Sequence, residues 1–86
     1  MPELCRFFGI IIRMFYNDHE PPHFHAVYGD DEVSVNIETL SIISGSLPRR
    51  AHALVLEWAA VHRDELRAAW NNANAGTKPS SIDPLE

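Results

Sequence analysis

The sequence has little cysteine, little positive charge and no long apolar run. Its single cysteine, Cys5, excludes a disulfide within the chain and a zinc site built from several cysteines. Seven Lys and Arg residues stand against twelve Asp and Glu residues, which gives a formal net charge of −5. Tight, sequence-independent binding of nucleic acid needs a basic surface, so this charge disfavours such binding.

The longest apolar run, Phe7 to Ile12, is far shorter than the ~20 residues that a membrane-spanning helix needs. No signal-peptide pattern is present either. We therefore expect a cytoplasmic protein without membrane contact. A length of 86 residues, 45% of them hydrophobic, predicts one small domain over residues 1–86 with one core.

Apolar and β-branched residues in the first half of the chain predict a sheet over residues 4–44. One strand is expected within residues 4–16, starting near Phe8, with Phe8, Ile10, Ile12 and Met14 on its core face. Two further strands, 23–28 and 32–38, flank the turn Gly29-Asp30-Asp31. Residues 39–44 are expected to form a short fourth strand or an edge segment.

The second half of the chain has helical periodicity. Pro48 suits the first turn of a helix and Gly76 suits its end, so one long helix is predicted over residues 49–75. Residues 77–86 are expected to form an extended tail. The predicted fold is therefore α+β: a three- to four-stranded antiparallel meander packed against one long C-terminal helix. On that helix His62 and Glu65, three residues apart on the stripe that faces the sheet, are expected to form a buried pair.

The most informative stretch runs from the loop after the first predicted strand into the second predicted strand. It holds His19, Glu20, His23 and His25, and the pair Pro21-Pro22 interrupts it. The prolines predict a stiff, extended loop that leads into a strand near His23. Side chains alternate across a strand, so His23 and His25 are expected on the same face, about 6–7 Å apart.

The pairing register of this strand decides which face that is. Pairing Tyr28 with Val33 places Phe24 and Ala26 on the apolar face of residues 32–38. Pairing Tyr28 with Glu32 instead would bury two imidazoles among valines, which costs a few kcal/mol for each unpaired group. We therefore expect His23 and His25 on the open face of the sheet, near Arg13.

Three interpretations of this histidine cluster stay open. His23 and His25 are two ligands for a divalent metal such as zinc, with His19 or Glu20 as the third. Alternatively, His23 and His25 act with Arg13 as catalytic groups on a phosphate, with His19 and Glu20 as binding residues and no metal. In the third interpretation the imidazoles only brace the loop by binding backbone groups that the prolines leave free.

Several stretches spread over the chain carry a family resemblance. They are Phe8 to Met14, Asn17 to Ala26, Ile37 to Leu40, Gly45 to Ala51, Glu57 to Arg63, and the closing residues Trp70, Gly76, Pro79, Ile82 and Pro84-Leu85-Glu86. In these stretches the chain resembles a bacterial family known only as domain of unknown function 4160. The His-x-Pro-Pro-His-x-His core is its most specific part.

The resemblance implies a small stand-alone cytoplasmic protein, encoded beside a second small protein in an arrangement similar to toxin–antitoxin pairs. We accordingly expect an interaction component of such a pair. The alternative is a small hydrolase or nuclease-like enzyme, or a metal-binding protein, that uses His19, His23 and His25. A homodimer or a small protein partner is expected, because Leu56, Ala59 and Trp70 form a second apolar strip on the helix and because Ile11 and Phe15 lie on the outer sheet face.

Overall fold

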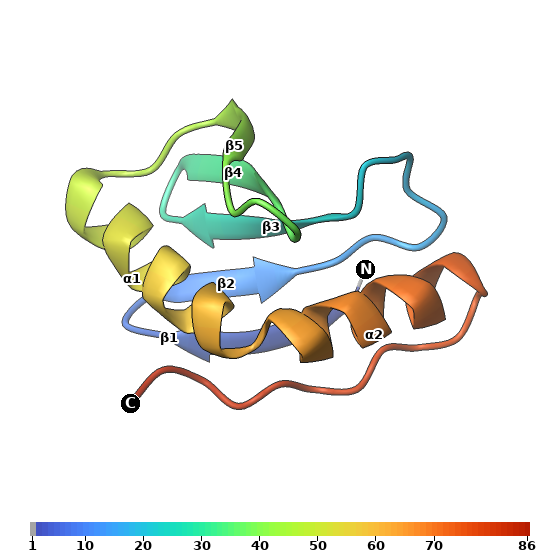
Figure 1. The fold of residues 1–86 in the computed structure, drawn as a ribbon. Helices are drawn as coiled ribbons and strands as arrows, with labels where there is room; N and C mark the ends of the chain where they lie inside the picture. The colour runs from blue at the N-terminus through green and yellow to red at the C-terminus, as the bar shows by residue number, and fades with distance from the viewer. Residues whose placement is uncertain (1) are drawn as a thin grey trace.

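The fold consists of an antiparallel sheet followed by two helices (Figure 1). A computed structural model describes residues 2–86. The elements are β1 (Glu3–Phe7), β2 (Ile10–Arg13), β3 (His23–Tyr28), β4 (Asp31–Asn36), β5 (Ile42–Gly45), α1 (Arg49–Val61) and α2 (Arg63–Asn74). Each strand pairs with the next in sequence, in the order β1-β2-β3-β4-β5. The α+β class and the meander are confirmed, whereas the predicted three to four strands and the single long helix are wrong.

The additional strand comes from a tight turn near the N-terminus. Phe8 and Gly9 have positive φ angles of 50° and 80°, and they join β1 to β2 as a two-residue hairpin loop. Such loops match the twist of the flanking strands. Phe8 therefore lies at a turn and is 60% exposed, which corrects its predicted core position. Ile10 and Ile12 are fully buried, as predicted.

The register of β3 against β4 keeps the predicted faces. Ala26 lies opposite Val33 and Phe24 lies opposite Val35, and all four side chains are buried. Tyr28 pairs with Asp31 rather than with Val33, so the predicted register is wrong by two residues. A shift of two residues returns every side chain to its original face, because the side-chain period of a strand is two.

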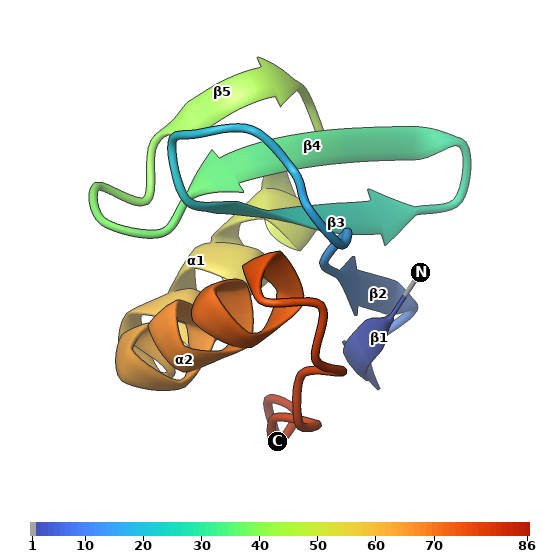
Figure 2. The ribbon, with the colours of Figure 1, turned by 90° about the vertical axis from the view of Figure 1, so that its right-hand side faces the viewer.

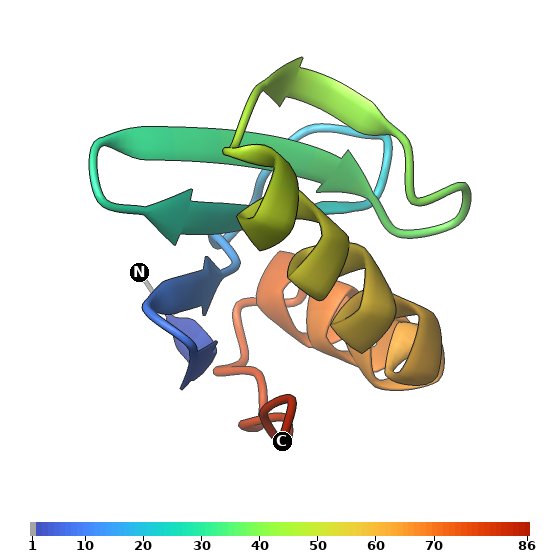
Figure 3. The ribbon, with the colours of Figure 1, turned by 90° about the vertical axis from the view of Figure 1, so that its left-hand side faces the viewer.

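The helical half is broken at His62, whose φ of −110° and ψ of 23° leave the helical region. Asp64 and Glu65 then occupy the first turn of α2, where negative charge is favourable, and Nδ1 of His62 lies 2.5 Å from Oε1 of Glu65. The predicted His62–Glu65 pair is therefore present, but it lies at the break with the Glu65 side chain 53% exposed, so its predicted burial is wrong. Figures 2 and 3 show the two helices on the same side of the sheet.

The break changes which helical residues are buried. On one straight helix Trp58 and Trp70 would point about 120° apart. In the broken helix both are buried, with 0% and 4% of their surface exposed. Ala59 is fully buried and Leu56 packs against the core, so the apolar strip expected to face a second subunit lies inside the molecule instead. Neither helix within residues 2–86 is long and apolar enough to cross a membrane.

The C-terminal tail covers one edge strand of the sheet, β1, whereas the other edge strand, β5, is exposed. The C-terminal tail runs beside β1 (Figure 1), where the N–H of Ile82 donates to the carbonyl of Leu4 at 3.1 Å. Ile82 is buried there. At the opposite edge all four residues of β5 are exposed, and Ile42 and Ile43 each keep 46% of their surface. Only the β1 edge is covered by the described part of the chain.

Candidate metal centre

The site begins at the N-terminal end of β3. His23 and His25 share one face of the strand, opposite Asn36 and Ser34 of β4, as the alternation predicts. Their exposure differs from the prediction, because their side chains are only 5% and 13% exposed. The loop between β2 and β3 rises beside β3 and β4 (Figure 2), and the ring of Trp70 lies 5.2 Å from the ring of His23. The sheet face is therefore covered at the position of His23.

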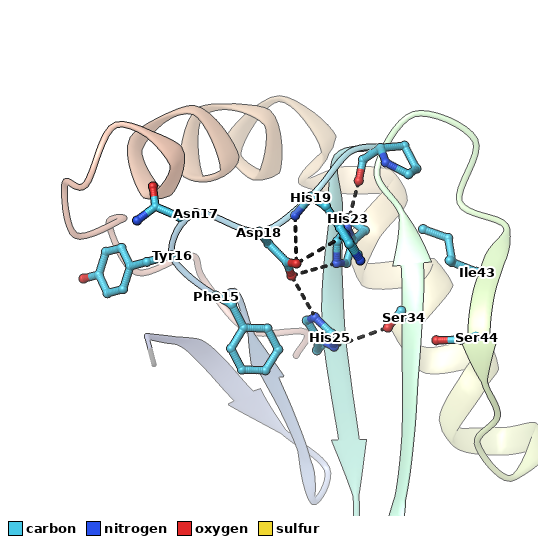
Figure 4. A pocket seen from close by; sticks show the side chains of 11 residues that line it. Phe15, Tyr16, Asn17, Asp18, His19, His23, His25, Ser34, Ile43 and Ser44 are labelled. Atoms are coloured by element: carbon cyan, nitrogen blue, oxygen red, sulfur yellow. Dashed lines mark hydrogen bonds and ion pairs between the residues drawn. The ribbon is translucent and has the colours of Figure 1, made fainter.

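Asp18 is the residue that the sequence interpretation missed. Its Oδ2 atom lies 2.9 Å from Nε2 of His23 and 3.5 Å from Nε2 of His25, and the three side chains point toward one another (Figure 4). Asn17, with a φ of 51°, turns the chain immediately before Asp18. Asn often adopts this left-handed conformation, so Asn17-Asp18 was the only local signal of such a turn.

The carboxyl group of Asp18 is held in its ionised form. Partial burial by itself raises the pKa of Asp18, but the hydrogen bond from the backbone N–H of His19 and the nearby imidazoles of His23 and His25 outweigh it. The net result is a lowered pKa for this carboxyl group. The site therefore contains a fixed negative charge beside two imidazole nitrogens.

The hydrogen bonds of His23 assign its tautomer. Its Nδ1 atom lies 2.7 Å from the carbonyl oxygen of Pro21, which can only accept, so Nδ1 carries the proton. This bond is the loop bracing considered above. The other nitrogen, Nε2, faces the carboxylate of Asp18, which also only accepts. That second contact therefore requires either a second proton on the ring or a cation between the two groups.

His25 has the same arrangement. Its Nδ1 atom lies 3.1 Å from Oε2 of Glu32 and 3.3 Å from Oγ of Ser34. The carboxylate of Glu32 only accepts, so it favours the proton on Nδ1 and leaves the lone pair of Nε2 directed at Asp18. Metal-binding histidines in proteins usually donate their second N–H to a carboxylate or a backbone carbonyl in this way. Glu32 and the Pro21 carbonyl thus orient the two imidazoles by accepting from their Nδ1 atoms, as the groups behind metal-binding histidines do.

The three inner atoms have the spacing of metal ligands. One ligand atom from each of Asp18, His23 and His25 lies within 4.8 Å of the other two. Ligands bound at about 2.0–2.1 Å around a tetrahedral zinc ion are separated by about 3.3 Å. The distances of 2.9 and 3.5 Å from Asp18 to the imidazoles lie on either side of that value. The cluster fits a small divalent ion with little rearrangement.

A cavity of about 570 Å³ opens beside this cluster. Phe15, Tyr16, Pro21 and Ile43 supply much of its wall, and the cluster residues lie among the others that line it. A metal held by three protein ligands would keep one coordination position open. Because Asp18, His23 and His25 line the cavity, a ligand in the cavity could reach that position.

The comparisons with known proteins give a family but no activity. The family model "Domain of unknown function (DUF4160)" matches residues 9–71. The chain belongs to this family. A search of the curated proteins found no match, and a search of the solved structures found none either. The resemblance described above is thereby confirmed, and the matched region includes every residue of the cluster.

Within this family member the other predicted site residues lie outside the inner cluster. The side chain of His19 is 87% exposed at the rim, with Nδ1 3.4 Å from Oδ1 of Asp18. Glu20 is exposed as well, so neither of the two residues expected as third ligand takes that position. Arg13 lies opposite His25 and shares its face, but it does not line the cavity. Arg13 also lies opposite Glu3. The pKa of Glu3 is lowered mainly by a hydrogen bond from Arg6, and the charge of Arg13 makes a smaller contribution in the same direction.

Proposed function

We propose that this protein binds a divalent transition metal, with zinc as the best fit, through Asp18, His23 and His25. The observation that carries the proposal is the orientation of the two imidazoles. The Pro21 carbonyl accepts a hydrogen bond from Nδ1 of His23, and the Glu32 carboxylate accepts one from Nδ1 of His25. The Nε2 atoms of both rings point toward Oδ2 of Asp18. A bound cation satisfies all of these contacts at once, whereas the free site needs an extra proton on a buried ring.

The proposed activity is metal-dependent hydrolysis. Catalytic zinc sites typically have three protein ligands and an open position, and a His-His-Asp set beside a cavity has this form. The metal would supply Lewis-acid chemistry. His19 is solvent-exposed and reaches the far oxygen of Asp18, which suits it to carry protons between the cavity and solvent.

The test is a calorimetric zinc titration of chelator-treated protein. We expect one zinc ion per chain, and we expect Asp18→Asn to weaken its binding by at least about tenfold, because a neutral amide replaces an ionised ligand. Glu20→Gln is the matched control, since it removes an exposed carboxylate two residues away. Equal zinc binding by the wild type and the Asp18→Asn variant would overturn the proposal.

A second candidate function is binding of a protein partner, as the expected toxin–antitoxin-like arrangement and the expected homodimer would require. The supporting observation is the exposed edge strand β5, whose Ile42 and Ile43 remain 46% exposed. Natural edge strands are usually protected by charge, proline or covering chain, and β5 itself has no charged residue or proline. A partner strand or a second copy could pair along this edge.

Light scattering tests this second function. We expect a species larger than a monomer, formed by the protein alone or with the product of a neighbouring gene, and we expect Ile42→Lys to dissociate it. A protein that stays monomeric at high concentration and does not bind the co-expressed product of the neighbouring gene would contradict partner binding. That result would leave the metal proposal unaffected.

A further inference from the structure

We infer that the cavity beside Asp18, His23 and His25 takes uncharged acyl compounds with an apolar body, such as amides or esters, and not phosphodiesters. The inference rests on the proposed metal site and names the class of substrate for it. It separates two enzymes that the sequence left open, a general hydrolase and a nuclease-like protein.

The first argument is the apolar wall of the cavity. The ring of Phe15 packs edge-on against His25, with 4.2 Å between ring centroids, so an apolar surface begins directly beside a proposed ligand. Tyr16 lies next to it and is 41% exposed. Figure 4 shows Phe15 and Ile43 on different sides of the histidines. An apolar group bound at the metal would thus meet carbon surface on more than one side.

The second argument is the position of Ile43. In the pairing of β4 with β5, Ser34 lies opposite Ser44 and Val35 lies opposite Ile42, so Ile43 is an extra, bulged residue. Ile43 lines the cavity and is 46% exposed, while its neighbour Ile42 is equally exposed but does not line it. An isoleucine at the rim of a polar cluster gains favourable burial when an apolar ligand in the cavity covers it.

The third argument is charge. None of the described residues that line the cavity is Lys or Arg. A divalent cation, the carboxylate of Asp18 and the carboxylate of Glu32 behind His25 have formal charges that sum to about zero. Proteins bind phosphate groups with Arg, Lys or the N-termini of helices, and such groups are missing from this wall. For a phosphodiester the metal would be the only positive partner among the described residues of this wall, and the two carboxylates already balance its charge. A neutral carbonyl needs no positive partner beyond the metal.

The size of the cavity agrees with this substrate class. A volume of about 570 Å³ is within the range of ~300–1,000 Å³ that small-molecule sites occupy. It is large enough for an aryl or branched alkyl group beside a metal-bound carbonyl. The apolar side chains and the metal would then bind two different parts of one ligand.

The experiment uses hydroxamic acids, which are uncharged in solution at neutral pH and bind zinc as hydroxamates, through the carbonyl oxygen and the deprotonated hydroxyl oxygen. The protein is loaded with one equivalent of zinc, and calorimetry measures the affinities of benzohydroxamic acid and acetohydroxamic acid. We expect the phenyl compound to bind about tenfold more tightly, because only its ring covers Phe15 and Ile43. Inorganic phosphate at roughly millimolar concentration should leave the affinity of benzohydroxamic acid nearly unchanged, within about twofold.

Two serine variants locate the effect. Ile43→Ser should remove most of the preference for the phenyl compound without changing the affinity for zinc, and Ile42→Ser is the matched control that should keep the preference. Equal binding of the two hydroxamic acids, or strong displacement by phosphate, would overturn the inference while zinc binding stands. Failure to bind zinc at all would instead overturn the proposed function, so the two failures are distinguishable.

Discussion

The indole N–H of Trp58 donates a hydrogen bond of 2.8 Å to the backbone carbonyl of Asp83, which joins the centre of the core to the C-terminal tail. Trp58 is fully buried, and its ring lies 5.6 Å from that of Phe7 and 5.9 Å from that of Phe24. One side chain thus contacts β1, β3 and the tail. The tail is an integral part of the fold, because it satisfies the only polar atom of this tryptophan side chain.

Trp58→Phe should destabilise the protein by about 1–3 kcal/mol, because it removes the hydrogen bond to Asp83 and leaves a small cavity. Urea denaturation followed by circular dichroism measures the change. Tyr16→Phe is the control, since it alters an exposed aromatic residue and should cost less than about 0.5 kcal/mol. Equal effects of the two changes would show that the tail contact contributes little.

Gly45→Ala should be among the most damaging single changes in the sheet. An added Cβ atom would clash with the carbonyl oxygen of Glu32, and the φ of 77° is unfavourable for alanine. Gly76→Ala has a similar φ of 80° but open space around the new atom, so it isolates the backbone cost of about 1–2 kcal/mol. We expect Gly45→Ala to exceed Gly76→Ala by at least about 2 kcal/mol in the free energy of unfolding. Comparable melting temperatures for the two variants would contradict this prediction.

His23→Gln and His25→Gln should differ in chelator-treated protein. His23 is buried and bound to the Pro21 carbonyl, so its replacement should cost about 1–3 kcal/mol, whereas His25→Gln should cost less than about 1 kcal/mol. Thermal melts measure both. Zinc should raise the melting temperature of the wild type and of neither variant, because zinc stabilises only a chain that binds it in the folded state. Zinc stabilisation that survives in both variants would exclude these histidines as ligands.

Glu32→Ala should weaken zinc binding by about tenfold, because Glu32 orients His25 by accepting from its Nδ1 atom. Asp31→Ala removes the same charge one residue earlier and should change the affinity by less than about threefold. Both variants are tested in the zinc titration described above. If the Asp31 change weakened binding as much as the Glu32 change, net charge rather than orientation would explain the loss.

Cys5 should be unreactive in the folded protein. Burial raises the pKa of its thiol to about 12, with a smaller contribution from the negative charges of Glu3 and Asp83. Since an unfolded thiol has a pKa near 8.5, alkylation by iodoacetamide at pH 8 should be about a thousandfold slower in the native protein. The raised pKa also means that this thiol stabilises the fold fully below about pH 8.5, and that this stabilisation declines as the pH rises toward 12. Equal alkylation rates in buffer and in urea would contradict the prediction.

The faces of the strands were predictable, because burial of apolar side chains on one side of a strand enforces a period of two. Val33, Val35 and the position of His25 follow from this rule. The Phe8-Gly9 turn was missed because apolar residues continue through it, so hydrophobicity alone suggests one strand. The helix break was missed for a similar reason, although Asp64-Glu65 is a typical beginning of a helix.

The site itself was only partly predictable. The histidines are close in sequence and on one strand, which makes their proximity a local property. Asp18 reaches them through a loop whose path depends on the turn at Asn17 and on the contact of Ile37 with the Pro22 carbonyl. Spacing cannot reveal such a path, so Glu20 and His19 looked equally suitable as the third ligand.

The burial of Trp70 beside His23 gives the protein an internal fluorophore at the site. The ring centroids are 5.2 Å apart, and a cation bound to Nε2 of His23 would change the electron distribution of the imidazole ring. Trp58 is hydrogen-bonded to the C-terminal tail instead, through the carbonyl of Asp83. We therefore expect the emission of this chain to combine a Trp70 signal that responds to cation binding at the cluster with a Trp58 signal that reports on folding, and replacement of either tryptophan by Phe would separate the two.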